Sequence, residues 1–186
     1  VIGGLSLVVL VLLIIKAMPI LKQLDELDPR AGEMYLNILN RIVESQSAME
    51  ALVVKVPVKE GITAREVDNS IRSIASELNI KHVGDLPMYK EVEALSGTPY
   101  RYTKIYLLCS AISAASMLDF NDAFASYLPC RITLIEDKQG KLWLYTHDMD
   151  LMIYGGKTLP PALKTETIKV RDIILKIMHR AAAGDF

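Results

Sequence analysis

Hydrophobic residues are concentrated at the start of the chain, where 16 of the first 21 residues are apolar. A helix that crosses a bilayer needs about 20 consecutive, mostly apolar residues. We therefore predict that residues 1–22 form a single transmembrane anchor, with the ammonium group of Lys16 reaching the lipid headgroups. A cleaved signal peptide and a buried helix of a soluble domain are the alternative interpretations of this apolar run.

The next segment has helical periodicity. Asp28-Pro29 is typical of a helix start, with Asp28 as the N-cap and proline at the first helical position. Apolar residues then recur at helical spacing, which predicts an amphipathic stalk helix within residues 23–50. This helix either packs on its own domain or contacts partner subunits. In the second case the interface would contain Met34, Ile38, Ile42 and Met49.

Residues 51–186 alternate between the two-residue period of strands and the 3.6-residue period of helices. We expect strands at 51–58, 80–88, 100–108, 131–137 and 141–147. We expect helices at 63–79, where Thr63 and Glu66 form a capping box, and at 89–95, 110–118, 121–127 and from Thr167 onward, with Gly184 just past the end. This order favours an α+β domain, a small sheet with helices packed mainly on one face.

The clearest hairpin joins residues 131–137 to 141–147 through Lys138-Gln139-Gly140. Residues 149–154 are apolar enough to extend its second strand. Trp143 and Tyr145 are two residues apart and should therefore share one face of the sheet. Core packing or an interface explains this aromatic pair better than a cofactor site does.

Composition narrows the classes of function. Hydrophobic residues make up 51% of the chain, which excludes an intrinsically disordered protein. The formal net charge is −1 and aromatic residues are 6%, so nucleic acid is not an expected partner. The sequence has no P-loop, nucleophile elbow or Gly-rich dinucleotide fingerprint. We expect no cofactor, no metal site and no catalytic residue, although enzymatic activity stays an open question.

Cys109 and Cys130 are the only cysteines of the chain. If the strands that end at Cys109 and begin at Cys130 are neighbours, both sulfurs approach one end of the sheet. Buried structural thiols, a disulfide, and a reactive or ligand-binding pair are all open interpretations. Arg131 is a candidate for stabilising a thiolate, although in a strand it points away from Cys130. His147, at the end of another strand, completes this candidate site.

Three stretches of the sequence, taken together, resemble a known family. The first is residues 54–58 with the helix that follows Thr63, and the second is Tyr106-Leu107-Leu108-Cys109. The third is Tyr127-Leu128-Pro129-Cys130-Arg131-Ile132, which leads into the acidic turn at 136–141. Together they resemble the domain of unknown function 302 family over residues 51–186. Cys109 occupies a position where that family frequently has a cysteine, whereas Ser110 replaces its usual asparagine.

The resemblance implies a small α+β domain and, for membrane-anchored members, a periplasmic location, but no reaction. We therefore expect a single-pass membrane protein that binds the lipid bilayer through residues 1–22. The favoured function is a non-catalytic accessory or assembly subunit of a larger membrane complex or of a homo-oligomer. The alternative is a thiol-dependent redox or sulfur-handling protein, or a haem or small-ligand binder, that uses Cys109 and Cys130.

Overall fold

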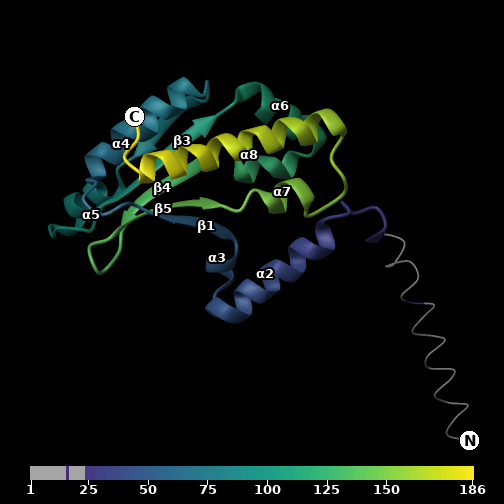
Figure 1. Ribbon diagram of the computed structural model, residues 1–186, viewed down its shortest axis with the longest axis horizontal. Coiled ribbons are helices and arrows are strands. Elements are labelled where there is room, and N and C mark those ends of the chain that lie inside the picture. The colour runs from purple at the N-terminus through teal and green to yellow at the C-terminus, as the bar shows by residue number, and fades with distance from the viewer. Residues whose placement is uncertain (1–15, 17–23) are drawn as a thin grey trace, which may run out of the picture.

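A computed structural model of the chain describes Lys16 and residues 24–186 (Figure 1). The anchor expected at residues 1–22 therefore lies outside the described residues, except for Lys16. Among the residues that the structure describes, no helix is both long enough and apolar enough to cross a membrane.

The fold contains one antiparallel sheet with the strand order β1-β5-β4-β3-β2. Its strands are β1 (Val53–Pro57), β2 (Lys81–Leu86), β3 (Thr103–Cys109), β4 (Cys130–Glu136) and β5 (Leu142–His147). The helices are α2 (Ala31–Ser45), α3 (Ala48–Ala51), α4 (Ala64–Glu77), α5 (Met88–Ser96), α6 (Ala111–Phe120), the 3-10 helix η1 (Asp122–Tyr127), α7 (Asp150–Tyr154) and α8 (Pro161–Ala182). The α+β class and the five strands expected from the sequence are confirmed.

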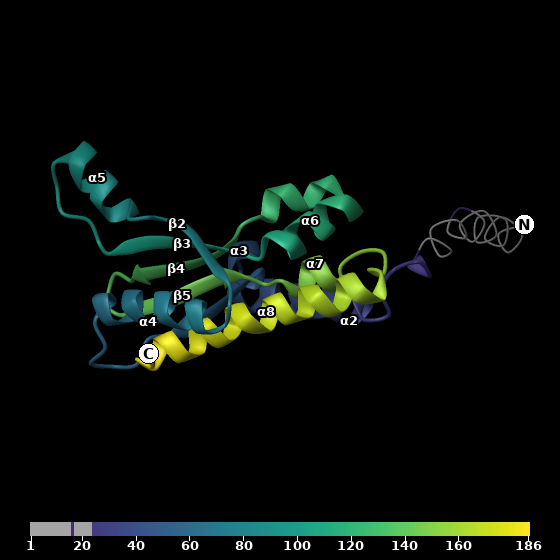
Figure 2. The same ribbon diagram turned by 90° about the horizontal axis from the view of Figure 1, so that it is seen from above.

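Helices α4 and α8 cover one face of the sheet (Figure 2). The expected capping box starts α4, because Glu66 N donates to the Thr63 hydroxyl and Thr63 N donates to the Glu66 carboxylate at 2.7 Å. Between the helices and the sheet lies the main hydrophobic core. Its largest side chains are Ile71 and Ile74 of α4, Tyr106, Leu108, Ile132, Leu134 and Leu144 of the sheet, and Ile174, Ile177 and Met178 of α8.

The opposite face of the sheet is covered much less. Figure 2 shows α5 and α6 on this side, at opposite ends of the sheet. The side chains between them are half-buried, and they alternate along the strands with the core residues. They include Ile105, Leu107, Ile135, Trp143 and Tyr145. We call this side the open face. Trp143 and Tyr145 share it, as expected from their spacing.

The segment after β5 differs from the expectation, because residues 149–154 form helix α7 and do not extend the strand. His147 is the last residue of β5 that pairs with β1, opposite Val53. Asp148 N still donates across to the Leu52 carbonyl at 2.9 Å, but the next backbone hydrogen bonds are local, from Leu151 N to the Asp148 carbonyl and from Met152 N to the Met149 carbonyl. The Asp148 carboxylate accepts a hydrogen bond from Asp150 N at 3.1 Å, which closes the turn into the helix.

Helix α8 begins at Pro161 and not at Thr167, as the sequence pattern had suggested. Proline is favoured in the first turn of a helix because it has no N–H that needs a partner there. Thr167 lies inside the helix, where its hydroxyl donates to the Leu163 carbonyl at 2.8 Å. The expectation at the other end is confirmed, since the helix ends at Ala182 and Gly184 follows with a positive φ of 76°.

The segment expected to be one stalk helix contains two helices, α2 and α3, separated at Gln46 in a left-handed conformation. Helix α2 begins at Ala31, later than Pro29, and Asp28 is not its N-cap. The Asp28 carboxylate is buried and forms an ion pair with Lys164 of α8. This tertiary contact therefore holds the start of α2 against the C-terminal helix, at a place where the sequence predicted a local cap.

Candidate functional site

The two cysteines lie on neighbouring strands but on opposite faces of the sheet. Leu108 of β3 pairs with Cys130 of β4, so Cys109 lies one residue beyond that pair. Side chains alternate along a strand, which directs Cys130 into the core and Cys109 toward the open face. Cys130 is 6% exposed, Cys109 is half-buried, and both are free thiols.

Cys130 is a weak nucleophile in this environment. Burial raises the pKa of its thiol to about 11, and the neighbouring Cys109 contributes to the increase. A buried thiol avoids ionisation because the apolar surroundings cannot solvate the thiolate. Arg131 follows in the sequence but extends to the other face, and its opposing effect on this pKa is smaller. Cys130 therefore behaves as a small apolar core residue.

Arg131 lies on the same face as Cys109. It pairs with Leu107, two residues before Cys109, so the two side chains are diagonal neighbours on the open face. His147 ends β5 on this face too, and the ring of Tyr127 approaches it edge-on at 6.3 Å between centroids. We call this group of Cys109, Tyr127, Arg131 and His147 the thiol end of the open face.

The thiol end combines the half-buried thiol of Cys109, the exposed guanidinium of Arg131 and a neutral imidazole. Burial, and then the positive charge of Arg131, lower the pKa of His147, so its ring is neutral at pH 7. The Nε2 atom of His147 is buried and has no hydrogen-bond partner among the described residues. Three of the four residues expected to form a thiol or ligand site are thus brought together, whereas Cys130 is separated from them by the sheet.

The described residues contain no group of three or more His, Cys, Asp or Glu side chains arranged to hold a metal ion. The groups of the thiol end that could take part in chemistry are the Cys109 sulfur and the Arg131 guanidinium, which attracts anions.

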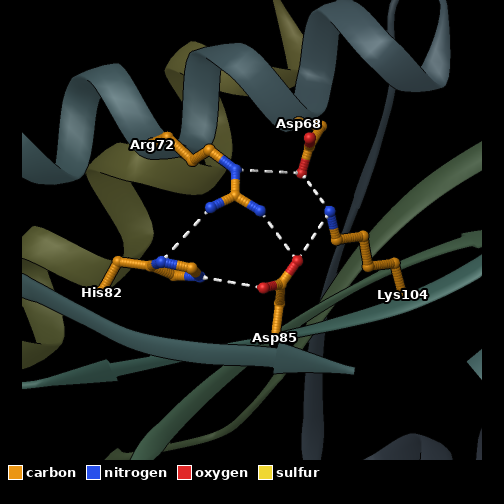
Figure 3. A network of polar contacts seen from close by, with 5 residues as sticks. All are labelled: Asp68, Arg72, His82, Asp85 and Lys104. Carbon is orange, nitrogen blue, oxygen red and sulfur yellow. Dashed lines mark hydrogen bonds and ion pairs between the residues drawn. The ribbon is translucent and has the colours of Figure 1, made fainter. Parts of the chain in front are cut away.

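A second polar cluster, which the sequence analysis missed, joins α4 to β2 and β3 (Figure 3). Lys104 Nζ lies 2.7 Å from Asp68 Oδ1 and 2.8 Å from Asp85 Oδ2. Arg72 contacts the same two carboxylates, with Nε 3.5 Å from Asp68 Oδ1 and Nη2 2.8 Å from Asp85 Oδ2. His82 completes the group, with Nδ1 3.4 Å from Arg72 Nη1. We call these five residues the ion-pair cluster.

The ion-pair cluster is electrically balanced when His82 is neutral, because it contains two carboxylates and two cations. Burial by itself would raise the pKa of Asp68, but the hydrogen bonds of Lys104 and Tyr106 and the charges of Lys104 and Arg72 together outweigh it and leave the pKa lowered. The pKa of Asp85 is also lowered, chiefly by its hydrogen bond with Lys104. Only the Asp68–Arg72 pair has a local signal in the sequence, the i,i+4 spacing. The cluster leaves no charge free for a ligand, so we assign it a structural role.

The four residues expected at a partner interface have different positions in the fold. Ile38 is buried against its own domain, Met34 and Ile42 are half-buried, and Met49 is exposed. Helix α2 carries another set of apolar side chains that are far more exposed. They are Leu36, Leu39 and Val43, with exposed fractions of 63%, 55% and 62%. We call these three residues the α2 stripe.

Comparison with known proteins finds a matching family model and a similar solved structure. A family model described as "Domain of unknown function DUF302" matches residues 54–181. No curated protein matches the chain. Among solved structures, the chain is similar to an uncharacterized conserved protein DUF302 from Bacillus stearothermophilus, with a TM-score of 0.56 and 14% sequence identity. The similarity covers 70% of this chain and 98% of that one. Helix α2 lies outside the matched residues.

Proposed function

Because this chain belongs to the DUF302 family, which has no assigned activity, we propose a function from its own surface features. We propose that it is a non-catalytic accessory or assembly subunit. In this proposal residues 1–22 attach it to a membrane as a single span, the DUF302 domain lies on the periplasmic side, and helix α2 contacts other subunits.

The α2 stripe is the observation that supports this proposal. Its three side chains are large, apolar and more than half exposed, and they follow one another at spacings of three and four residues. Contiguous apolar surface on a soluble domain usually marks a site of protein or membrane contact. The stripe also lies close in sequence to the apolar run at residues 1–21, which favours an assembly at a membrane.

Extraction of the full chain from membranes in mild detergent, followed by native mass spectrometry, tests the proposal. We expect the chain in the membrane fraction, at a mass greater than that of one 20.7 kDa copy. A variant without residues 1–22 serves as the matched control and should leave the membrane fraction. A full-length chain that is soluble without detergent, or that is monomeric at micromolar concentration, would refute the accessory-subunit proposal.

A second candidate function is thiol chemistry at Cys109, and the position of Arg131 on the same face supports it. The thiolate is the reactive form of cysteine, and reactive cysteines are commonly found beside arginine or lysine. The proposed redox or sulfur-handling protein would use Cys109, the less buried of the two thiols. Cys130 would take part only after movement of the sheet, since it faces the core.

Alkylation of the native protein with iodoacetamide, followed by peptide mass spectrometry, separates the two cysteines. With a pKa of about 11, roughly one Cys130 thiol in a thousand is ionised at pH 8. We expect Cys109 to be modified while Cys130 remains protected until the protein is denatured. Cys109→Ser is the control, since it should abolish native labelling. If neither cysteine reacts before denaturation and no disulfide is found, thiol chemistry is excluded.

A further inference from the structure

Helix α2 has two apolar faces, and among the residues that the structure describes only one of these faces is packed against the rest of the protein. The inner face docks on its own domain, where Ile38 is 9% exposed and Arg41 forms an ion pair with Asp148 at 2.7 Å. Tyr35 adds a hydrogen bond from its hydroxyl to the Gly155 carbonyl. The α2 stripe lies on the other side of the helix, because positions 36, 39 and 43 are rotated by about 100° to 160° from Ile38. A helix held in place on one side therefore presents a free apolar side.

We propose that the α2 stripe is the contact with a second copy of this chain, in which two α2 helices pack side by side in parallel. The spacing of Leu36, Leu39 and Val43 is that of a short a-d-a seam of a two-stranded coiled coil. Leucine at d with a β-branched residue at a is a combination that favours two parallel strands, and Leu39 and Val43 have this arrangement.

The charges next to the stripe favour the parallel orientation. Glu33 and Glu44 lie on one side of the stripe, about 16 Å apart along the helix, whereas Tyr35 and Ile42 lie on the other side. In an antiparallel pair each acidic side would face the acidic side of the second copy, which is unfavourable. In a parallel pair the acidic side of each helix faces the uncharged side of its partner. An anionic bilayer surface is disfavoured as the occupant by the same two carboxylates.

This inference rests on the proposed membrane attachment. If two chains are anchored through residues 1–22 in the same bilayer, both α2 helices begin on the membrane side, as a parallel pair requires. A stable interface usually buries about 800 Å² on each partner, more than three side chains provide. Attachment to one membrane raises the effective concentration of the two stripes, so that a small contact is sufficient.

Cysteine cross-linking in intact membranes tests the geometry. In a full-length Cys109→Ser background, we compare the single variants Leu36→Cys, Leu39→Cys and Val43→Cys under mild oxidation. A disulfide needs Cα atoms within about 7 Å, so we expect each stripe variant to yield about tenfold more covalent dimer than Asn37→Cys. Asn37 is the matched control, because it is exposed on the same helix but lies off the stripe.

Each result either supports the parallel pair or overturns it. Dimers from all three positions support it, whereas an antiparallel pair would cross-link Leu36→Cys only when mixed with Val43→Cys. Equal cross-linking of the stripe variants and of Asn37→Cys, in a protein whose mass exceeds that of a monomer, overturns this inference but leaves the accessory-subunit proposal in place.

Leu39→Glu is a second variant. It should convert the assembly to monomers with an unchanged melting temperature, because Leu39 does not contribute to the core. A monomeric wild-type chain overturns both proposals.

Discussion

Replacing Ile177 with alanine is expected to lower the free energy of unfolding by about 3 kcal/mol. Ile177 has no exposed surface and lies on α8 in the core between the helices and the sheet. The substitution removes three buried carbon atoms and leaves a cavity that rigid neighbours on α4 and on the sheet cannot fill. Urea denaturation monitored by circular dichroism measures the change.

Ile112→Ala is the matched control, since Ile112 lies on helix α6 with 84% of its surface exposed. The same atoms are removed there without a cavity, so we expect a change within about 0.5 kcal/mol. Similar losses of stability in the two variants would contradict the assignment of the face between α4, α8 and the sheet as the main core.

Replacing Lys104 with methionine is expected to lower the free energy of unfolding by about 2 kcal/mol. The side chain of Lys104 is 11% exposed and bridges the carboxylates of Asp68 and Asp85. Its loss leaves the half-buried carboxylate of Asp68 and the carboxylate of Asp85 with Arg72 as the remaining cation of the ion-pair cluster (Figure 3). This expected loss of unfolding free energy is smaller than the roughly 3–5 kcal/mol typical of breaking a fully buried ion pair, because water partly screens these charges.

Lys157→Met is the control for this substitution. Its ion pair with Glu26, at 3.4 Å, is mostly exposed to solvent and should contribute less than about 1 kcal/mol. A loss of stability no greater for Lys104→Met than for Lys157→Met would show that the ion-pair cluster does not hold α4 to the sheet.

The same cluster predicts how stability changes with pH. The pKa values of Asp68 and Asp85 are lowered in the folded state, so the unfolded chain binds protons more strongly. Their contribution to stability is therefore complete above the unfolded pKa of about 4 and is lost as the pH falls below it. Without Lys104 the two pKa values rise toward their unfolded values, and the loss of stability between pH 5 and 2 should become shallower.

The local elements were predictable from the sequence because their causes are local. Alternation of apolar residues fixed the strands of the β4–β5 hairpin to within one or two residues. The capping box at Thr63 uses side chains three residues apart, so it was recognisable before any packing was known. Residues 149–154 were misread because an apolar run of this length fits a strand or a buried helix equally well.

For the thiol end, the sequence could predict the position of Arg131 but not that of Cys109. Strand alternation placed Arg131 on the face opposite Cys130, and the structure agrees. Whether Cys109 would join Cys130 or Arg131 depends on the register between β3 and β4, which no local pattern specifies. The pairing of Leu108 with Cys130 decides it, and the two sulfurs are placed on opposite faces as a result.

The sequence alone determined the hydrophobic periodicities, the helix cap and the hairpin, since each depends on residues only a few positions apart. The tertiary structure decided which apolar faces are buried. Ile38 is covered by its own domain while Leu39 is left exposed, although both are leucine-sized residues of one helix. It also brought Asp68, Asp85 and Lys104 together from three separate elements. These outcomes depend on strand register and helix packing, which bring together segments far apart along the chain.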